Sequence, residues 1–390
     1  MVLAVCACVV AAHAAEPAQH APAKRLVVGL DDDTAKWRNR PDRLLATYRH
    51  LGVDAVRLTI PWQRGQNRPT AEAGIYLHRA AAMVARGQRV VLAVYGKPQQ
   101  APLDAVQRRH YARFLKHVLT RIPKIRDVVV WNEANSTEFW PAEGGAPAYE
   151  ALLAECWDLL RGLRPYPNII SSTAARHDPA GFMRDVGAAY RASGRKKPIL
   201  TTFGHNPYPM NASEPPWVRH DDPTNVSQAD LPRYLHALRD AFAGTKQPLP
   251  SAERPSVWYM ENGFQTTVAA SKSHHYHGEE TDHWVVPPLA PAGVEPWYRD
   301  QASQLRDALF LAQCQLEVGA FFNFELIDEH RLAGWQSGVM WRDGTRKPSY
   351  EPFRQAVDAV QSGVIDCASV PGAGGPIPER PRDALAGNPG

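Results

Sequence analysis

The sequence predicts an α/β protein built as one (β/α)8 barrel of the TIM type, and two observations lead to this prediction. Short apolar runs alternate eight times with longer amphipathic stretches between residues 25 and 360. Such alternation predicts parallel strands joined by helices, and a barrel of this kind takes about 250 residues or more. Several apolar runs also stop abruptly at polar or charged residues, as expected where barrel strands end at the functional face.

The predicted strands are rich in Val, Ile, Leu and aromatic residues, which is the composition of strands buried on both faces. The first stops at an acidic triplet that begins with Asp31, and the fourth stops at Asn132 and Glu133. In chain order the predicted strands span residues 25–30, 54–60, 89–95, 127–131, 168–173, 198–203, 256–261 and 319–325.

The stretches between these strands have helical character. The first begins with Pro41, and proline is favoured in the first turn of a helix. The predicted helices span residues 41–52, 76–86, 103–121, 149–163, 179–192, 231–242, 296–317 and 349–360. Three connections that follow strands are longer than usual, namely 204–230, 262–295 and 326–348, and we expect them on the functional face.

The two ends of the chain predict segments outside the barrel domain, which we place at residues 25–365. Residues 1–15 resemble a signal peptide with a small-residue cleavage site at Ala12-His13-Ala14, although an uncleaved apolar tail is the alternative. Residues 16–24 read as a linker, and the Pro/Gly-rich residues 366–390 as a disordered tail. We therefore expect a secreted protein, extracellular or periplasmic, with no membrane association after cleavage.

Charge and cysteine content narrow the possible partners. The net charge is +4 and no run of five Lys or Arg occurs, so no nucleic-acid partner is expected. Cys156 and Cys314 fall in helical patterns and are predicted to be buried apolar residues rather than disulfide partners, while the pairing of Cys367 stays open. No CxxC spacing of the metal-binding type is present, and we expect a monomer without a metal or cofactor.

Two of the predicted strands end in a glutamate. One is the β-branched run that ends at Asn132 and Glu133, and the other is an aromatic-rich run that ends at Glu261. A carboxylate closing an apolar strand is costly to bury without a partner or a task. Strand ends of a barrel meet at one face, so both glutamates are expected in one cleft, about 5–5.5 Å apart if they perform glycoside hydrolysis with retention.

The motifs around these glutamates resemble those of a known group of enzymes. Trp-Asn-Glu-Ala-Asn at 131–135 and Met-Glu-Asn-Gly at 260–263 are similar to the acid/base and nucleophile motifs of glycoside hydrolase clan A, which includes cellulase-like families 5 and 39. The resemblance spans residues 25–360. It implies a hydrolase that cleaves a β-linked oligo- or polysaccharide by double displacement, with Glu133 as general acid/base and Glu261 as nucleophile.

The resemblance also implies roles for residues on other strands. Arg57, inside the second strand, matches the arginine that contacts the nucleophile, although a structural ion pair with Asp31 or Asp32 is the alternative. Asn132 is expected to bond the sugar 2-hydroxyl. Asp31 is interpreted as a substrate hydrogen-bonding group.

Three further substrate-binding residues follow from the resemblance. His205 and Tyr208 match a His and a Tyr near the nucleophile, but two residues separate them here where one is expected. Trp335 matches the tryptophan under the cleaved sugar. The sequence holds 11 Trp, and those near strand ends are candidates either for the core or for stacking on sugar rings: Trp62, Trp131, Trp140, Trp335 and Trp341.

Two other functions remain open from the sequence. One is a barrel that binds carbohydrate without cleaving it. The other is a metal-dependent hydrolase that uses His274, His275 and His277. Among nearby acids, Glu138 is expected to be solvated, and Glu325, with Asp328 and Glu329, is a candidate for binding substrate.

Overall fold

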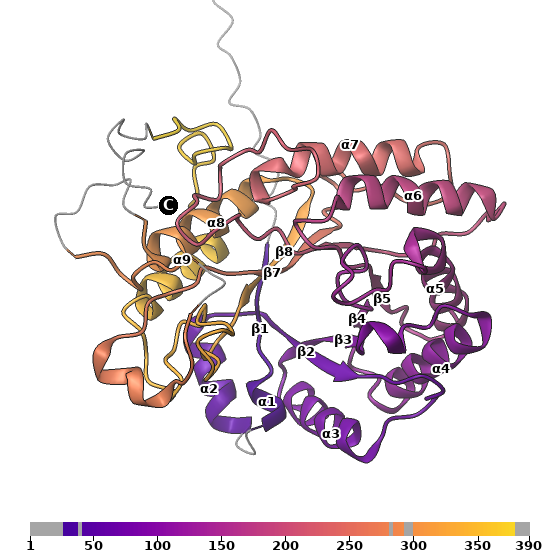
Figure 1. Ribbon diagram of the computed structural model, residues 1–390, viewed down its shortest axis with the longest axis horizontal. Helices are drawn as coiled ribbons and strands as arrows, with labels where there is room; N and C mark the ends of the chain where they lie inside the picture. The colour runs from indigo at the N-terminus through magenta and orange to yellow at the C-terminus, as the bar shows by residue number, and fades with distance from the viewer. Residues whose placement is uncertain (1–25, 38–40, 281–283, 292–298, 379–390) are drawn as a thin grey trace, which may run out of the picture.

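A computed structural model of the chain describes residues 26–37, 41–280, 284–291 and 299–378. Eight parallel strands form one sheet in the order β5-β4-β3-β2-β1-β8-β7-β6. Bridges from Ile170 to Thr202 and from Ala174 to Asn206 join the two edges, so the barrel is nearly closed (Figure 1). The (β/α)8 fold predicted from the sequence is confirmed. The strands are β1 Val27–Asp31, β2 Ala55–Pro61, β3 Arg89–Tyr95, β4 Asp127–Val130, β5 Asn168–Ile170, β6 Phe203–His205, β7 Val257–Asn262 and β8 Val318–Phe324.

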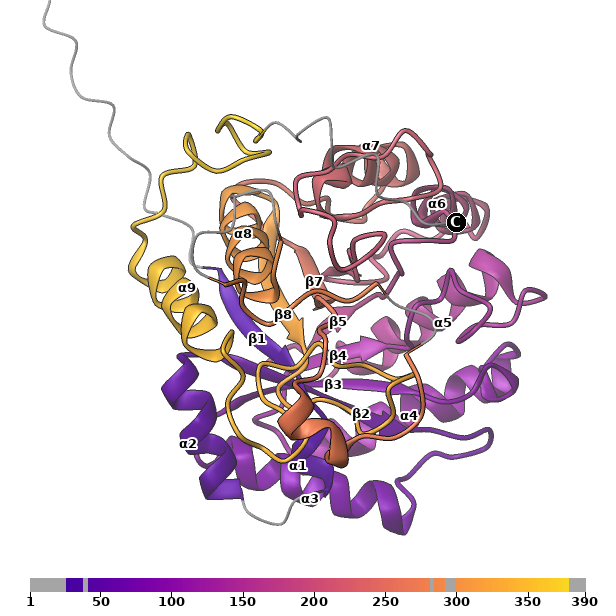
Figure 2. The ribbon, with the colours of Figure 1, turned by 60° about the vertical axis from the view of Figure 1, so that its left-hand side comes forward.

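Helices surround the barrel, with α6 lying beside α7 and α8 beside α9 (Figures 1 and 2). Their apolar faces pack on the strands, and their N-termini are capped by residues such as Thr70, Asp104 and Asp300. The helices are α1 Thr34–Trp37, α2 Pro41–Leu51, α3 Ala71–Ala85, α4 Ala105–Arg121, α5 Gly145–Leu160, α6 Pro179–Ala192, α7 Leu231–Phe242, α8 Gln301–Cys314 and α9 Tyr350–Ser362, with short 3-10 turns η1 Pro98–Gln100, η2 Gln228–Asp230 and η3 Ala270–His275. In the described part of the chain, no helix is both long and apolar enough to cross a membrane.

The inside of the barrel is a packed core of its own. Side chains from alternating positions of the strands fill it. Neighbouring strands lie so close together that some positions have room only for a small residue. Gly29 of β1 faces the ring of Phe322 of β8, and a Cβ at that glycine would overlap the ring. The interior cluster consists of Ala55, Val91, Ala93, Val129, Ile170, Trp258, Met260, Ala320 and Phe322.

The sixth strand begins five residues later than predicted. The sequence predicted a strand over 198–203, but β6 spans Phe203–His205. The amide groups of Ile199 and Leu200 donate to Oε1 of Gln247, at 2.9 and 3.3 Å, and not to a neighbouring strand. A distant side chain therefore satisfies the first part of this run, whereas the backbone N–H groups of Thr201 and Thr202 donate to the carbonyl oxygen of Ile169 in β5.

The ends of the chain are only partly described. The predicted signal peptide 1–15 and linker 16–24 lie outside the described residues, as do residues 379–390. The prediction of disorder from residue 366 onward is corrected over 366–378. There Cys367 forms a disulfide with Cys314 of α8, and Val370 packs on Trp217 and Leu311. Cys314 is therefore not the unpaired apolar residue that was predicted, whereas Cys156 is free and buried as expected.

The disulfide is expected to stabilise the folded protein. It closes a sequence separation of 53 residues, for which loop-closure entropy gives a stabilisation of about 4 kcal/mol. Reduction by dithiothreitol should lower Tm by roughly 5 °C, measured by calorimetry. The double variant Cys314→Ser/Cys367→Ser should melt at the lower temperature with or without reductant. Equal melting temperatures for the oxidised and reduced wild type would contradict this role.

Candidate active site

Glu133 lies just beyond β4, on an unusual stretch of backbone. Trp131 and Glu133 both have positive φ, at 65° and 38°, although neither is glycine. Such conformations are costly and occur most often at functional sites. The ring of Trp131 is fully buried and its Nε1 donates to the carbonyl of Phe139 at 2.7 Å, which holds the turn in place. The backbone N–H of Glu133 donates to Oγ of Ser172 at 3.1 Å, so the segment that follows β5 also fixes its position.

The carboxyl group of Glu133 accepts a direct hydrogen bond from a side chain. Nδ2 of Asn206 donates to its Oε1 at 2.7 Å. Burial, and then the negative charge of Glu261, raises the pKa of Glu133 to about 8, while the Asn206 bond and the charge of Arg57 act in the opposite direction. A carboxyl group with a pKa near 8 is protonated at neutral pH and is able to act as a general acid.

Glu261, in β7, has a different environment. Its Oε1 lies 2.8 Å from Nη1 of Arg57, and its Oε2 accepts a hydrogen bond from the hydroxyl of Tyr208 at 3.2 Å. These contacts orient the carboxyl group of Glu261 and provide it with a cation and a hydroxyl donor. The predicted contact of Arg57 with Glu261 is confirmed, and so is a cationic and hydroxyl-donating environment for this carboxylate.

Arg57 joins three parts of the site. It is 1% exposed, and it pairs with Asp31 of β1 as well as with Glu261. Its Nη2 donates to Oδ1 of Asn132 at 2.9 Å. The two alternatives for Arg57, a contact with the nucleophile or a structural ion pair with Asp31, are therefore both realised. A buried cation shared by two carboxylates fixes β1, β2, β4 and β7 relative to one another.

Two adjoining cavities meet at Glu261. The first, of about 760 Å³, contains Asp31, Arg57 and Asn132 in its wall. The second, of about 360 Å³, contains Glu133 and Tyr208. Three residues line both cavities, namely Phe139, Glu261 and Trp335. The two cavities are of ordinary ligand-binding size and together form one cleft across the carboxyl ends of the strands, which we call the double cleft.

Seven of the eight predicted site residues line this double cleft, and His205 does not. Its side chain is 1% exposed and points toward α7, where its ring stacks on Tyr234 at 4.8 Å. Its Nε2 lies 2.8 Å from the carbonyl oxygen of Val226, and its Nδ1 lies 3.0 Å from Oγ1 of Thr173. Burial lowers the pKa of His205 to about 4, so the ring is neutral. The prediction that His205 binds substrate is corrected to a structural role.

The sequence interpretation missed Asn206, the next residue. Asn206 is fully buried and holds the carboxyl group of Glu133, a role that the sequence analysis assigned to no residue. The available signal was its place in the run Gly-His-Asn-Pro-Tyr after the sixth strand. The face that each residue takes depends on where the strand ends.

Most of the tryptophans near strand ends belong to the core. Those that are nearly or fully buried are Trp62, Trp131, Trp140 and Trp341. Trp335 is partly exposed and lines both cavities, with its ring centroid 5.2 Å from that of Tyr208 and 5.5 Å from that of Phe324. Only Trp335 of the five is therefore a candidate for stacking on a sugar ring.

Trp335→Ala should lower kcat/KM by about 10- to 100-fold with little change in Tm, because the indole covers the apolar face of a bound sugar. Trp341, which is 5% exposed, supplies the control. Trp341→Ala should cost about 3–5 kcal/mol of unfolding free energy. Steady-state kinetics and calorimetry on both variants separate the two roles. A large loss of stability with unchanged kinetics in Trp335→Ala would show that Trp335 is a structural residue of the core and does not bind substrate.

Other acidic and histidine residues are placed as follows. Glu138 is exposed, as expected, at the edge of the Glu133 cavity. His274 and His275 stack at 3.9 Å, and His277 lies against His330 at 4.8 Å. In the residues that the structure describes, no group of three or more His, Cys, Asp or Glu side chains is placed to hold a metal ion.

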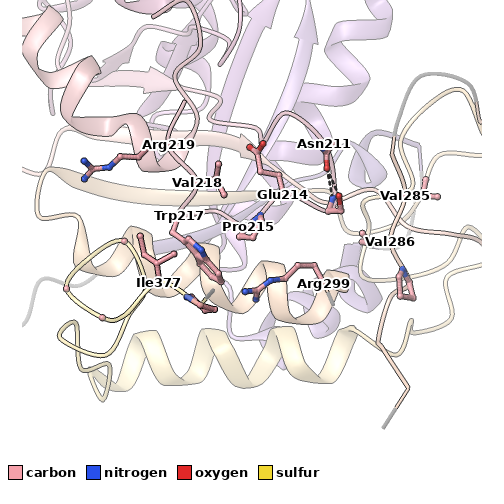
Figure 3. Close-up of a pocket in the computed structure, with 16 residues that line it drawn as sticks. Asn211, Glu214, Pro215, Trp217, Val218, Arg219, Val285, Val286, Arg299 and Ile377 are labelled. Carbon is pink, nitrogen blue, oxygen red and sulfur yellow. Dashed lines mark hydrogen bonds between the residues drawn. The ribbon is translucent and has the colours of Figure 1, made fainter. Parts of the chain in front are cut away.

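A cavity larger than either part of the double cleft lies elsewhere, between the loop after β6 and the segment that follows the disulfide. It has a volume of about 1080 Å³, and Trp217, Arg299 and Ile377 contribute to its wall (Figure 3). The guanidinium group of Arg299 lies over the ring of Trp217 at 4.2 Å and pairs with Asp307 at 2.9 Å. Neither Glu133 nor Glu261 lines it. Size alone therefore does not decide the choice of candidate site, and the paired carboxyl groups make the double cleft our candidate.

No family model and no curated protein sequence matches the chain. Solved structures do resemble it. A family 39 glycoside hydrolase from Bacteroides cellulosilyticus WH2 superposes with a TM-score of 0.62 at 15% identity, over 87% of this chain and 64% of that one. A glucosidase from Croceicoccus marinus superposes with a TM-score of 0.58 at 10% identity, over 88% of this chain and 69% of that one. The exo-β-1,4-mannosidase Op5Man5 from Opitutaceae bacterium strain TAV5 superposes with a TM-score of 0.54 at 15% identity, over 87% of this chain and 60% of that one. At such identities the likeness is one of fold, and this chain spans about two thirds of those proteins.

Proposed function

We propose that this protein is a secreted retaining glycoside hydrolase of the clan A type, which cleaves β-linked oligo- or polysaccharides. The observation that carries the proposal is the contrast between two carboxyl groups of one cleft. Glu133 is partly buried with a pKa raised to about 8, and Glu261 is held by Arg57 and Tyr208. One acidic and one charged carboxyl group are what glycoside hydrolysis with retention requires.

Each glutamate has a defined step in this chemistry. Glu261 attacks the anomeric carbon while Glu133 gives its proton to the glycosidic oxygen, so the leaving sugar departs as an alcohol. Glu133, now a carboxylate, takes a proton from water, and that water attacks the anomeric carbon. The bond to Glu261 breaks, the sugar leaves with its original configuration, and both glutamates return to their starting states.

The surrounding residues support these roles. Arg57 and Tyr208 orient the carboxylate of Glu261 and stabilise its charge when it is regenerated. Asn206 holds the carboxyl group of Glu133 in place, and Asn132 lines the larger cavity, where it is able to bond a sugar hydroxyl. Every group in the proposed reaction belongs to the chain itself.

The β-linked substrate class and the location have separate support. Similar folds include an exo-β-1,4-mannosidase and fungal β-1,4-galactanases, and the double cleft has room on both sides of Glu261. The disulfide between Cys314 and Cys367 supports secretion, because disulfides persist in oxidising compartments.

The test is hydrolysis of a panel of aryl β-glycosides and β-linked polysaccharides by the purified protein, followed by proton NMR of the first product anomer. We expect turnover that resists chelators and gives the β-anomer first. An α-anomer as first product would overturn the retaining mechanism. Binding of oligosaccharides without hydrolysis would make the protein a carbohydrate-binding barrel instead.

A further inference from the structure

If the proposed function holds, the two cavities of the double cleft bind different parts of the substrate. Glu133 lines only the smaller cavity, and a general acid must lie beside the oxygen of the leaving group. The smaller cavity therefore receives the leaving group. The larger cavity contains Glu261, Arg57 and Asn132 but not Glu133, so it receives the glycone, the sugar that is transferred to Glu261.

The glycone cavity has a carboxyl group that the proposed reaction does not use. Glu325 follows β8, and its Oε1 is buried without a hydrogen-bond partner in the described part of the chain. Leaving a buried polar atom unpaired is costly, and a ligand that donates a hydrogen bond removes that cost. The sugar hydroxyls of a glycone are such donors.

The charges around Glu325 are negative. Burial, and then the charges of Glu329, Asp32, Asp328 and Asp31, raise the pKa of Glu325 well above its usual value.

The cations of this region are occupied or exposed. Arg57 pairs with Asp31 and Glu261, and Lys347 pairs with Asp328 at 2.7 Å with both side chains fully buried. Arg331 and Arg342 line the cavity but are exposed to solvent. Across the residues that the structure describes, no ion pair joins a cation to Glu325 or Glu329.

We propose that Glu325 hydrogen-bonds hydroxyl groups of an uncharged glycone, and that its acidic surroundings exclude glycones with a carboxylate. A uronic acid would place its negative charge among carboxyl groups that no buried cation is free to offset. A neutral sugar satisfies Oε1 of Glu325 at no such cost. The site therefore selects neutral over acidic β-glycosides.

The first arm of the test compares matched substrates on the wild-type protein. Each aryl β-glycoside that is cleaved is paired with the uronide that has a carboxylate in place of its hydroxymethyl group. The neutral member should have a kcat/KM about 100-fold higher. Equal rates, or faster cleavage of the uronides, would overturn the proposal.

The second arm changes Glu325. Glu325→Leu keeps the approximate shape but cannot bond a hydroxyl, so kcat/KM on neutral glycosides should fall by about 10-fold or more. Glu325→Gln keeps hydrogen bonding and should lose clearly less. Glu150 is a matched control, since it is also buried with an unpaired Oε1 but lies on α5 outside both cavities. Glu150→Gln should leave the kinetics unchanged. Equal losses for Glu325→Leu and Glu325→Gln would overturn the proposed hydrogen bond.

Binding of free sugars separates this inference from the proposed function. Saturation-transfer NMR should show contact of wild-type protein with neutral monosaccharides and much less with the corresponding uronic acids. Glu325→Leu should weaken the signal of the neutral sugars. If this contrast holds while no glycoside is cleaved, the proposed hydrolase activity fails and the ligand preference of the cavity stands. If cleavage occurs without the contrast, only the inference about Glu325 fails.

Discussion

Glu261→Ala should lower kcat/KM by about 10⁴-fold or more, because it removes the group that attacks the anomeric carbon. The variant should still fold. Arg57 keeps its ion pair with Asp31 and its hydrogen bond to Asn132, so no buried cation is left unpaired. Sodium azide should restore turnover by attacking from the vacated side, and the glycosyl azide should have inverted configuration.

The measurements are initial rates with an aryl glycoside, with and without azide, and proton NMR of the glycosyl azide. Glu150→Ala, which removes a buried glutamate far from the cleft, is the control and should give no azide effect. Activity of Glu261→Ala within about tenfold of wild type would rule out Glu261 as the nucleophile. A retained azide product would do the same.

Strands with uniform apolar composition were the most predictable part of the fold. Residues 89–95 were predicted as a strand and form β3, and the strand predicted at 54–60 differs from β2 by one residue at each end. Strands buried on both faces have continuous β-branched runs, and this signal is local. The disulfide between Cys314 and Cys367 and the hydrogen bond from the backbone N–H of Ile199 to Gln247 were not predictable, because they join residues far apart in the sequence.

In the candidate active site, the most predictable feature was the need of a charged residue in an apolar strand for a partner of opposite charge. Arg57 needs an anionic partner wherever β2 lies, and the pairing with Glu261 followed from that requirement. Asn206 could not be chosen over His205 on the same ground. Successive residues of a strand face opposite sides, so a small error in the end of the strand exchanges the two side chains. β6 ends at His205, whose ring faces α7, and Asn206 therefore reaches Glu133.

Glu133→Ala should separate the two steps of the reaction. For glycosides with a poor leaving group, rates should fall by about 10²- to 10⁴-fold, because no proton reaches the departing oxygen. Dinitrophenyl glycosides need no such proton, so they should still transfer their sugar to Glu261. The glycosyl-enzyme should then accumulate, because no base activates water. Azide, which needs no base, should release it with retained configuration.

The pH dependence tests the same role independently. Glu133 must be protonated in the free enzyme, and burial beside the charge of Glu261 raises its pKa to about 8. Glu133 with this raised pKa is protonated below about pH 8 and deprotonated above it. The kcat/KM of the wild type should therefore fall as the pH rises through about 8. Glu133→Ala has no such proton to lose, so its kcat/KM on dinitrophenyl glycosides should lack this decline. If the decline persists in the variant, or if azide gives the same stereochemistry with Glu133→Ala and Glu261→Ala, the roles assigned to the two glutamates are wrong.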